Sequence, residues 1–96
     1  MDGLCSWSNC GSRITVDGTI LDFPPFRVSS KTSIDQPDIV FDGTKYFVVW
    51  FYSGGIYGAR IRPDGTVLDP NGFLISSNGG YTPAVAYGAG VYLVVW

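Results

Sequence analysis

The feature that most constrains this chain is an internal repeat that takes in most of its 96 residues. Segment 37–50, which reads PDIVFDGTKYFVVW, returns 46 residues later as segment 83–96, which reads PAVAYGAGVYLVVW. A second set of matches, 47 residues apart, joins segment 13–30 to segment 60–77. Such repeats are typical of architectures in which each copy buries its apolar surface against a neighbouring copy. The sequence therefore predicts two copies of one structural unit.

Each copy has the residue pattern of short β-strands. Val, Ile, Tyr, Phe and Trp crowd short runs, while Gly, Pro, Asp and Asn fill the gaps. Asp-Gly dipeptides at 17–18, 42–43 and 64–65 favour tight turns, because glycine tolerates the positive φ that such turns need. No window shows a capped helical stripe, so the predicted fold class is all-β. The predicted strands are residues 38–41, 46–52, 56–62 and 66–68 continuing to 73–76, with counterparts at 84–87, 92–96, 9–15 and 19–21 continuing to 26–29.

The second predicted strand of the complete copy is apolar along its length. Residues 46–51 read YFVVWF, without the alternation of polar and apolar side chains that a half-exposed strand shows. We therefore expect other parts of the protein to cover both faces of this strand.

The repeat resembles the blades of bacterial β-propellers. A unit of about 40–50 residues with four antiparallel strands is typical of a propeller blade. The resemblance rests on YLVVW in the second strand, IYGARI in the third and DGTVLD in the following hairpin, and it covers residues 10–96. The chain lacks the Gly-His and Trp-Asp motifs of WD40 proteins and the Asp-box of sialidases. The resemblance thus implies the architecture of a blade and no particular function.

The order of the predicted strands favours a blade that is shared between copies of the protein. Residues 37–76 form a complete blade, whereas residues 9–29 match its third and fourth strands and residues 83–96 its first and second. An isolated two-stranded fragment is marginal in water, and its open edge invites pairing. We expect residues 83–96 of one chain to pair head-to-tail with residues 9–29 of the next. Closed rings hold about 4–8 blades, which leaves a dimer, a trimer or a tetramer of two-blade chains. The first strand is small in one copy and larger in the other, and this favours six blades from three chains.

Composition narrows the classes of partner. The chain is 46% hydrophobic and only 15% charged, which favours burial of apolar surface against a partner. A net charge of −2, with six dispersed Lys and Arg residues, argues against nucleic acid. No apolar run approaches the roughly 20 residues that span a membrane, and the first residues lack the pattern of a secretory signal. The sequence leaves the location open, with the cytoplasm as the default expectation.

The sequence predicts neither a metal site nor a catalytic group. Cys5 and Cys10 are the only cysteines, and they form either two free thiols or a local disulfide; no cofactor is expected. The chain has no histidine, which removes the commonest general base. Arg13 and Arg60, at equivalent positions, either bind an anion or, as we favour, pack their stems between blades. Turn chemistry accounts for seven of the eight acidic residues, namely Asp17, Asp22, Asp35, Asp38, Asp42, Asp64 and Asp69.

The candidate ligand site lies on the loops that we expect at one end of the blades. Connections between units, and between the second and third strands, emerge on the same face of a propeller, and loops on a rigid scaffold commonly carry function. Aromatic rings beside amides and carboxylates suit a neutral polar ligand such as a sugar. The candidate ligand-binding residues are Trp7, Asp35, Gln36, Tyr52, Tyr57 and Tyr81.

These features favour a non-catalytic binding module, lectin-like or protein-binding, within an oligomeric β-propeller. Two alternatives stay open. One is a structural fragment of a larger propeller with no independent activity, and the other is a hydrolase or lyase that uses carboxylates around a central channel. Ligand sites in multiples of the subunit number would favour the binding module, whereas close carboxylates near the axis would favour the enzyme.

Overall fold

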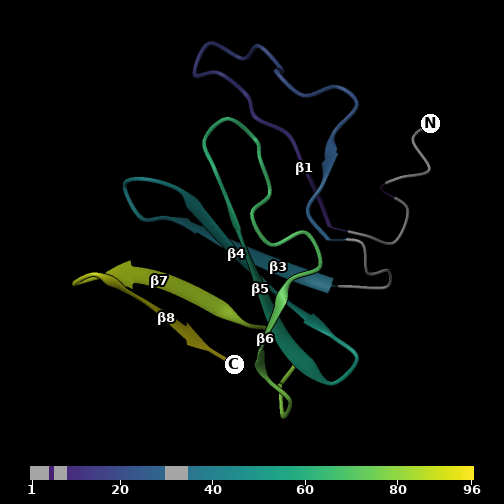
Figure 1. Cartoon of the computed structure of the whole chain (residues 1–96), viewed down its shortest axis with the longest axis vertical. Coiled ribbons are helices and arrows are strands. Elements are labelled where there is room, and N and C mark those ends of the chain that lie inside the picture. Colours follow the sequence, from purple (N-terminus) through teal and green to yellow (C-terminus); the bar gives the residue numbers. More distant parts are fainter. Residues whose placement is uncertain (1–4, 6–8, 30–34) are drawn as a thin grey trace.

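The structure, a computed structural model, describes Cys5 and residues 9–29 and 35–96. The described residues contain no α-helix, and every strand pair is antiparallel, so the predicted all-β class is confirmed (Figure 1). The strands are β1 Cys10–Gly11, β2 Phe26–Arg27, β3 Asp35–Phe41, β4 Tyr46–Tyr52, β5 Gly55–Ile61, β6 Phe73–Ser76, β7 Ala84–Gly88 and β8 Val91–Val95.

The centre of the molecule is a four-stranded sheet in the order β3-β4-β5-β6. Strands β4 and β5 pair without interruption, from Tyr46 opposite Ile61 to Tyr52 opposite Gly55. The two-residue loop between them consists of Ser53 and Gly54, both with positive φ, which is the conformation that the tightest hairpins need. The Asp-Gly turns predicted from the sequence also have their glycines at positive φ, for example +96° at Gly43.

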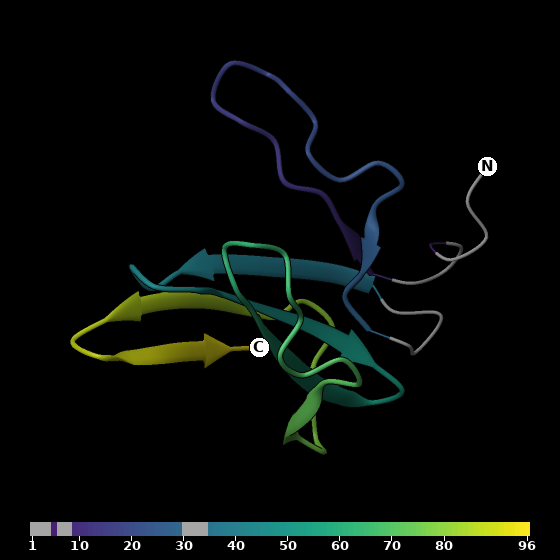
Figure 2. The ribbon, with the colours of Figure 1, turned by 45° about the horizontal axis from the view of Figure 1, so that its top comes forward.

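Two smaller sheets lie on opposite sides of the central sheet (Figure 2). The sheet β1-β2 contributes Val28, directly after β2, to a buried cluster with Val48, Trp50 and Ala59. On the other side, Tyr92 of the β7-β8 sheet stacks on Phe47, with the ring centroids 4.3 Å apart. The Val85 amide also donates to the Asp38 carboxylate at 2.9 Å, which ties β7 to β3.

Both faces of β4 are covered, as its apolar sequence predicts. Phe47, Val48, Val49 and Trp50 are all buried, although neighbouring residues of a strand point to opposite faces of the sheet. Val48 and Trp50 face the cluster that contains Val28, and Phe47 faces Tyr92. The strand is therefore the middle layer of a three-layer arrangement of sheets. These sheets do not close on themselves, and the propeller architecture stays a prediction.

The observed strands depart from the predicted bounds in both copies. Strand β3 begins at Asp35, earlier than predicted, and contains a register shift before Asp38. The predicted strand 66–68 provides only an isolated bridge between Ile61 and Val67, and most of the predicted strand 9–15 is likewise irregular. One physical reason lies at the amides of Arg13 and Arg60. Each donates to a carboxylate instead of a carbonyl of the facing strand, and this interrupts the ladder.

Candidate functional site

Two loops meet at one end of the central sheet. The amide of Gly79, in the connection from β6 to β7, donates to the carbonyl of Gly54, in the loop from β4 to β5, at 3.0 Å. The indole Nε1 of Trp96 donates to the Asn78 carbonyl at 3.1 Å, which brings the residue after β8 to the same place. The expectation that these two loops lie side by side is therefore met by the described residues. We call this region the aromatic end; its rings are those of Phe51, Tyr52, Tyr57, Tyr81 and Trp96.

The aromatic end brings some of the predicted site residues together and separates others. Tyr52 and Tyr57 are in edge-to-face contact with ring centroids 5.9 Å apart, and Tyr57 also stacks on Trp50 at 6.4 Å. Tyr81 instead packs on Phe51, at 5.1 Å. Because Phe51 and Tyr52 are neighbours in a strand, Tyr81 lies on the opposite face of the sheet from the Tyr52–Tyr57 pair. The three tyrosines thus form two separate aromatic surfaces.

The remaining predicted site residues are only partly visible. The backbone of Asp35 lies opposite Phe51, so the start of β3 reaches the aromatic end, and Gln36 follows it in the same strand. The side chains of Asp35 and Gln36, and all of Trp7, lie outside the described part of the structure.

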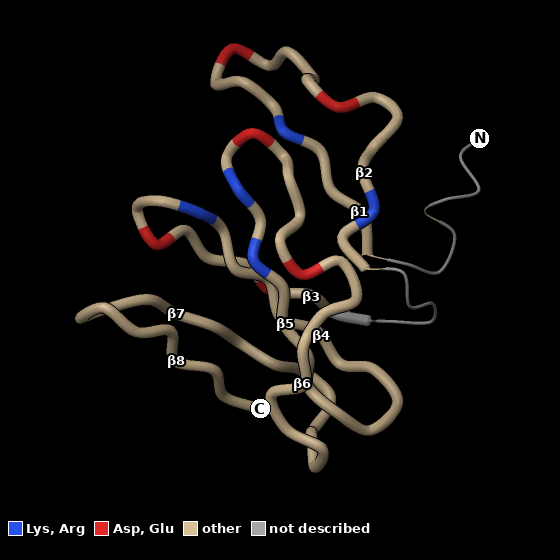
Figure 3. The backbone as a smooth tube through the Cα atoms, viewed as in Figure 1, with Lys and Arg blue, Asp and Glu red and all other residues tan. Residues whose placement is uncertain are grey.

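Charged residues gather at the opposite end of the molecule (Figure 3). The loop between β4 and β5 carries no charged residue, and neither does segment 70–96. Tyr81 is 76% exposed, with one side supported by Phe51 and the rest open to solvent. Apart from Asp35, whose side chain lies outside the described residues, the aromatic end therefore offers an uncharged surface to a ligand.

The two repeated arginines are held by carboxylates of their own chain. Arg13 Nε lies 2.9 Å from Asp22 Oδ2, and Nη2 donates to Oδ1 of the same carboxylate at 2.9 Å. Arg60 and Asp69 make the same two contacts, at 2.8 and 3.0 Å. These hydrogen bonds lower the pKa of each aspartate and raise the pKa of each arginine. The arginines are therefore structural groups with a carboxylate partner, and the less favoured alternative, an anion site, is not formed by them alone.

Arg13 also reaches from one hairpin to the next. Its Nη1 donates to the Pro63 carbonyl at 3.4 Å, and a Cβ added at Gly65 would lie 3.2 Å from its Nε. The expectation that the arginine stem packs between units is partly met, since the side chain lies across the neighbouring turn. Its guanidinium is nevertheless paired with Asp22, a contact that the residue pattern alone does not predict.

Most described aspartates serve as hydrogen-bond acceptors in hairpins. Asp42 accepts from the Thr44 and Lys45 amides at 2.8 Å and from the Tyr92 hydroxyl. The bond from Tyr92 is the largest cause of a pKa well below the usual range for Asp42. Asp17 accepts from the Thr15 hydroxyl and then from the Thr19 hydroxyl, and Asp64 accepts from the Thr66 amide; these bonds also lower the pKa values of both aspartates. The turn interpretation was wrong for Asp35, which lies in β3, whereas Asp38 lies in the same strand as predicted.

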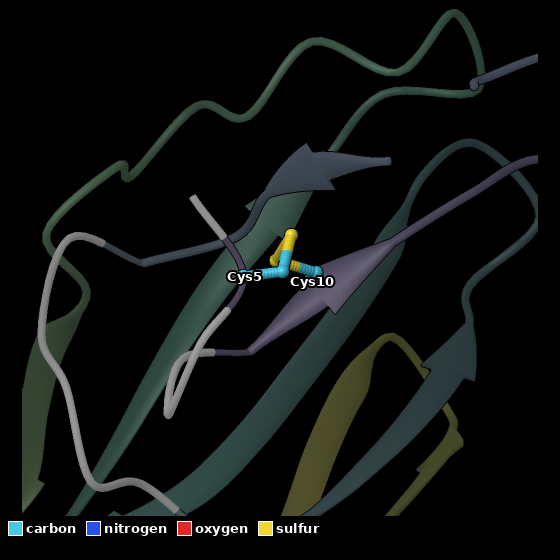
Figure 4. Close-up of a disulfide and its surroundings, with 2 residues drawn as sticks. All are labelled: Cys5 and Cys10. Atoms are coloured by element: carbon cyan, nitrogen blue, oxygen red, sulfur yellow. A yellow bond between two sulfur atoms is a disulfide. The ribbon is translucent and has the colours of Figure 1, made fainter. Parts of the chain in front are cut away.

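The Cys5 and Cys10 side chains form a disulfide, with their Cα atoms 5.7 Å apart (Figure 4). The structure thus has the second of the two states left open by the sequence. Within the described ranges, no three side chains of the kinds that bind metal ions come together. No helix there is long and apolar enough to cross a membrane.

A hollow lies between the β1-β2 sheet and the edge of the central sheet. It encloses about 490 Å³, and its polar lining includes Asn9, Ser12 and Asp38. Asn9 is only 7% exposed, and its Nδ2 has no hydrogen-bond partner among the residues that the structure describes. Sequence reasoning missed this hollow, because it is created by the packing of two sheets that share no local motif. We call it the β1 groove.

Neither a protein-family model, nor a curated protein sequence, nor a solved structure matches this chain. The two candidate regions for a function are therefore the aromatic end and the β1 groove.

Proposed function

We propose that this chain is a non-catalytic binding module, lectin-like or protein-binding, in a β-propeller of six blades assembled from three chains. The observation that carries the binding role is the exposed Tyr81 ring, which packs on Phe51 and lies in a segment, 70–96, without charged residues. Tyrosine supplies a large, rigid, amphipathic surface at little cost in conformational entropy, which is why it is frequent at binding sites.

The support of the Tyr81 ring favours recognition of a flat, weakly polar group. Phe51 packs against the ring and limits its rotation, so little freedom is left to lose when a ligand stacks on the open side. The apolar face of a sugar ring or the side chain of a peptide fits such a surface. Hydroxyl groups of the same ligand would find the backbone amides and carbonyls of segment 77–82 close by.

The environments of the carboxylates favour binding over catalysis. A general acid or base near neutral pH needs a pKa close to the working pH. The pKa values of Asp22, Asp42 and Asp69 are instead lowered by hydrogen bonds. These groups are therefore anions near neutral pH, and they stabilise turns and arginines.

The proposal is tested by screening the assembled protein against glycan and peptide arrays, followed by titration of any ligand found. Tyr81→Ala should weaken binding at least about tenfold, because the loss of an aromatic contact residue of this kind costs about 2 kcal/mol. Tyr87→Ala is the matched control, since Tyr87 is also partly exposed but lies at the far end of β7. A wild-type protein that binds nothing on either array, or a Tyr81→Ala variant that binds like wild type, would overturn the proposal.

A further inference from the structure

The β1 groove is open beside a strand that has an unused edge. Within the described residues β1 pairs only with β2, and its other edge faces the groove. Across the groove lie apolar side chains of the central sheet, including Ile39, Val48 and Ile61. The hollow is thus shaped like a slot next to a strand edge, with an apolar wall.

The pairing of β4 with β5 in the central sheet is a template for what the free edge of β1 would bind, because β1 lies in the repeat segment that corresponds to β5. In the central sheet, β5 pairs with β4, and the partners include Tyr46 opposite Ile61 and Val48 opposite Ala59. Segment 9–15 corresponds to β5 with an offset of 47 residues, and β8 corresponds to β4 with an offset of 46. Structural contacts support this correspondence. The Arg13–Asp22 and Arg60–Asp69 pairs recur 47 residues apart, and so do the bridges from Ile14 to Ile20 and from Ile61 to Val67.

The β7-β8 hairpin has an exposed apolar face whose equivalent in the central sheet is buried. Leu93 is 64% exposed and Val95 is 53% exposed, whereas their counterparts Phe47 and Val49 are 4% and 0% exposed. A second exposed apolar surface lies near the start of the chain. Ile14 is 61% exposed, whereas its counterpart Ile61 is 5% exposed. The two uncovered surfaces are thus different from each other and belong to opposite faces of the repeated unit, as a head-to-tail contact requires.

We propose that the β1 groove receives the β7-β8 hairpin of a second copy of this chain, with β8 paired antiparallel to segment 10–14. The template sets the register, with Tyr92 opposite Ile14, Val94 opposite Ser12 and Trp96 opposite Cys10. This inference rests on the ring assembly of the proposed function, and it is independent of any ligand.

The new contact continues one that already exists within the chain. Phe26 and Val28 of the β1-β2 sheet pack on the central sheet beside Val48 and Ile61. In the proposed register, Leu93 and Val95 of the inserted hairpin would cover the rest of the same face. The merged sheet would then have the strand order β7-β8-β1-β2, which corresponds to β3-β4-β5-β6 of the central sheet. Its first two strands would come from one copy and its last two from the other.

The same template adds one polar contact between copies. Arg13 donates to the Pro63 carbonyl of the neighbouring hairpin, and it lies over Gly65. With the offset of 47 residues, Arg60 of one copy would donate to the Val16 carbonyl of the next and lie over Gly18. Arg60 is more exposed than Arg13, with 45% against 34% of its side chain accessible, as expected for an arginine whose hairpin partner belongs to another copy.

Disulfide trapping between two variants tests the register. Ser12→Cys and Val94→Cys are made separately in a Cys5→Ser, Cys10→Ser background, and are then mixed and oxidised. Covalent dimers should form in the mixture and in neither variant alone, because positions 12 and 94 face each other only across the contact. Val95→Cys mixed with Ser12→Cys is the matched control, since adjacent strand residues point to opposite faces and should trap poorly.

Native mass spectrometry of the untreated wild-type chain accompanies the trapping. A dominant species at three times the chain mass is expected. A folded 10.4 kDa species at micromolar concentration would overturn the docking proposal. So would equal trapping in the control mixture, or dimers from one variant alone. If trapping succeeds and the array screens find no ligand, the docking proposal stands and only the binding role is refuted. If trapping fails and a ligand is found, the binding role stands and the docking proposal is refuted.

Discussion

Replacement of Gly72 by alanine probes the tightest packing contact of the central sheet. Gly72 has a φ of +71°, and an added Cβ would lie 2.6 Å from Cζ2 and 2.8 Å from Cη2 of Trp50. Trp50 is fully buried, so its ring has no room to withdraw. Positive φ costs an L-residue about 1–2 kcal/mol, and overpacking of a well-filled core adds about 1–3 kcal/mol. Gly72→Ala should therefore lower the free energy of unfolding by about 2–5 kcal/mol.

Gly90→Ala provides the matched control for this prediction. Gly90 has a similar φ of +80°, but an added Cβ would meet nothing within 4 Å. It should show only the conformational part of the loss, about 1–2 kcal/mol. Urea denaturation of both variants at one protein concentration measures the difference. If the two variants lose the same free energy of unfolding, the close contact of Trp50 with Gly72 is refuted. If Gly72→Ala loses more, the same change made together with Trp50→Phe should lose less, because phenylalanine lacks the outer indole atoms.

Three further outcomes concern charge and covalent structure. Hydrogen bonds lower the pKa values of Asp22 and Asp42 below the ordinary 3.8, so their stabilising contribution is present above that pH and is lost as the pH falls through the folded-state values; denaturation curves that match at neutral pH and at about pH 2–3 would contradict this. Burial, followed by the bond to Asp42, raises the pKa of Tyr92 to about 12, so its contribution is lost as the pH rises from 10 towards 12, and Tyr92→Phe should remove one late step from a spectrophotometric tyrosine titration. Reduction of the Cys5–Cys10 disulfide should lower stability by about 2 kcal/mol, because it closes a short loop, and a Cys5→Ser, Cys10→Ser variant should then be insensitive to reductant.

The sequence predicted the parts of the fold that depend on local residue pattern. The apolar run 46–52 became β4, and the Asp-Gly dipeptides became turns with positive φ. Strand bounds were less accurate where side chains compete with the backbone ladder. At Arg13 and Arg60 the signal was present, because each arginine has an aspartate nine residues later. That spacing does not by itself predict an ion pair, since nothing in the local sequence shows that the two arms of the hairpin bring these side chains together.

The candidate site was harder to predict than the fold. Tyr52, Tyr57 and Tyr81 were selected because they lie near loops, and the loops do meet at Gly54 and Gly79. The alternation of β4 then sends Tyr81 to the face opposite the other two tyrosines, through its contact with Phe51. Which face a loop residue joins depends on tertiary packing, and a single sequence carries no direct signal for it. The β1 groove was missed for the same reason.

The contact of Arg13 with the turn at Gly65 has a consequence for how the repeated units diverge in evolution. A side chain at position 65 would be strained by the local φ of +93°, and it would also press on an arginine that belongs to the preceding unit. Substitution there would require a change at position 13, in a different copy of the repeat. Neighbouring units linked in this way cannot accumulate mutations independently. Their hairpins should drift as a coupled pair, while positions such as 43 and 88, where an added side chain meets nothing, are free of this constraint between units.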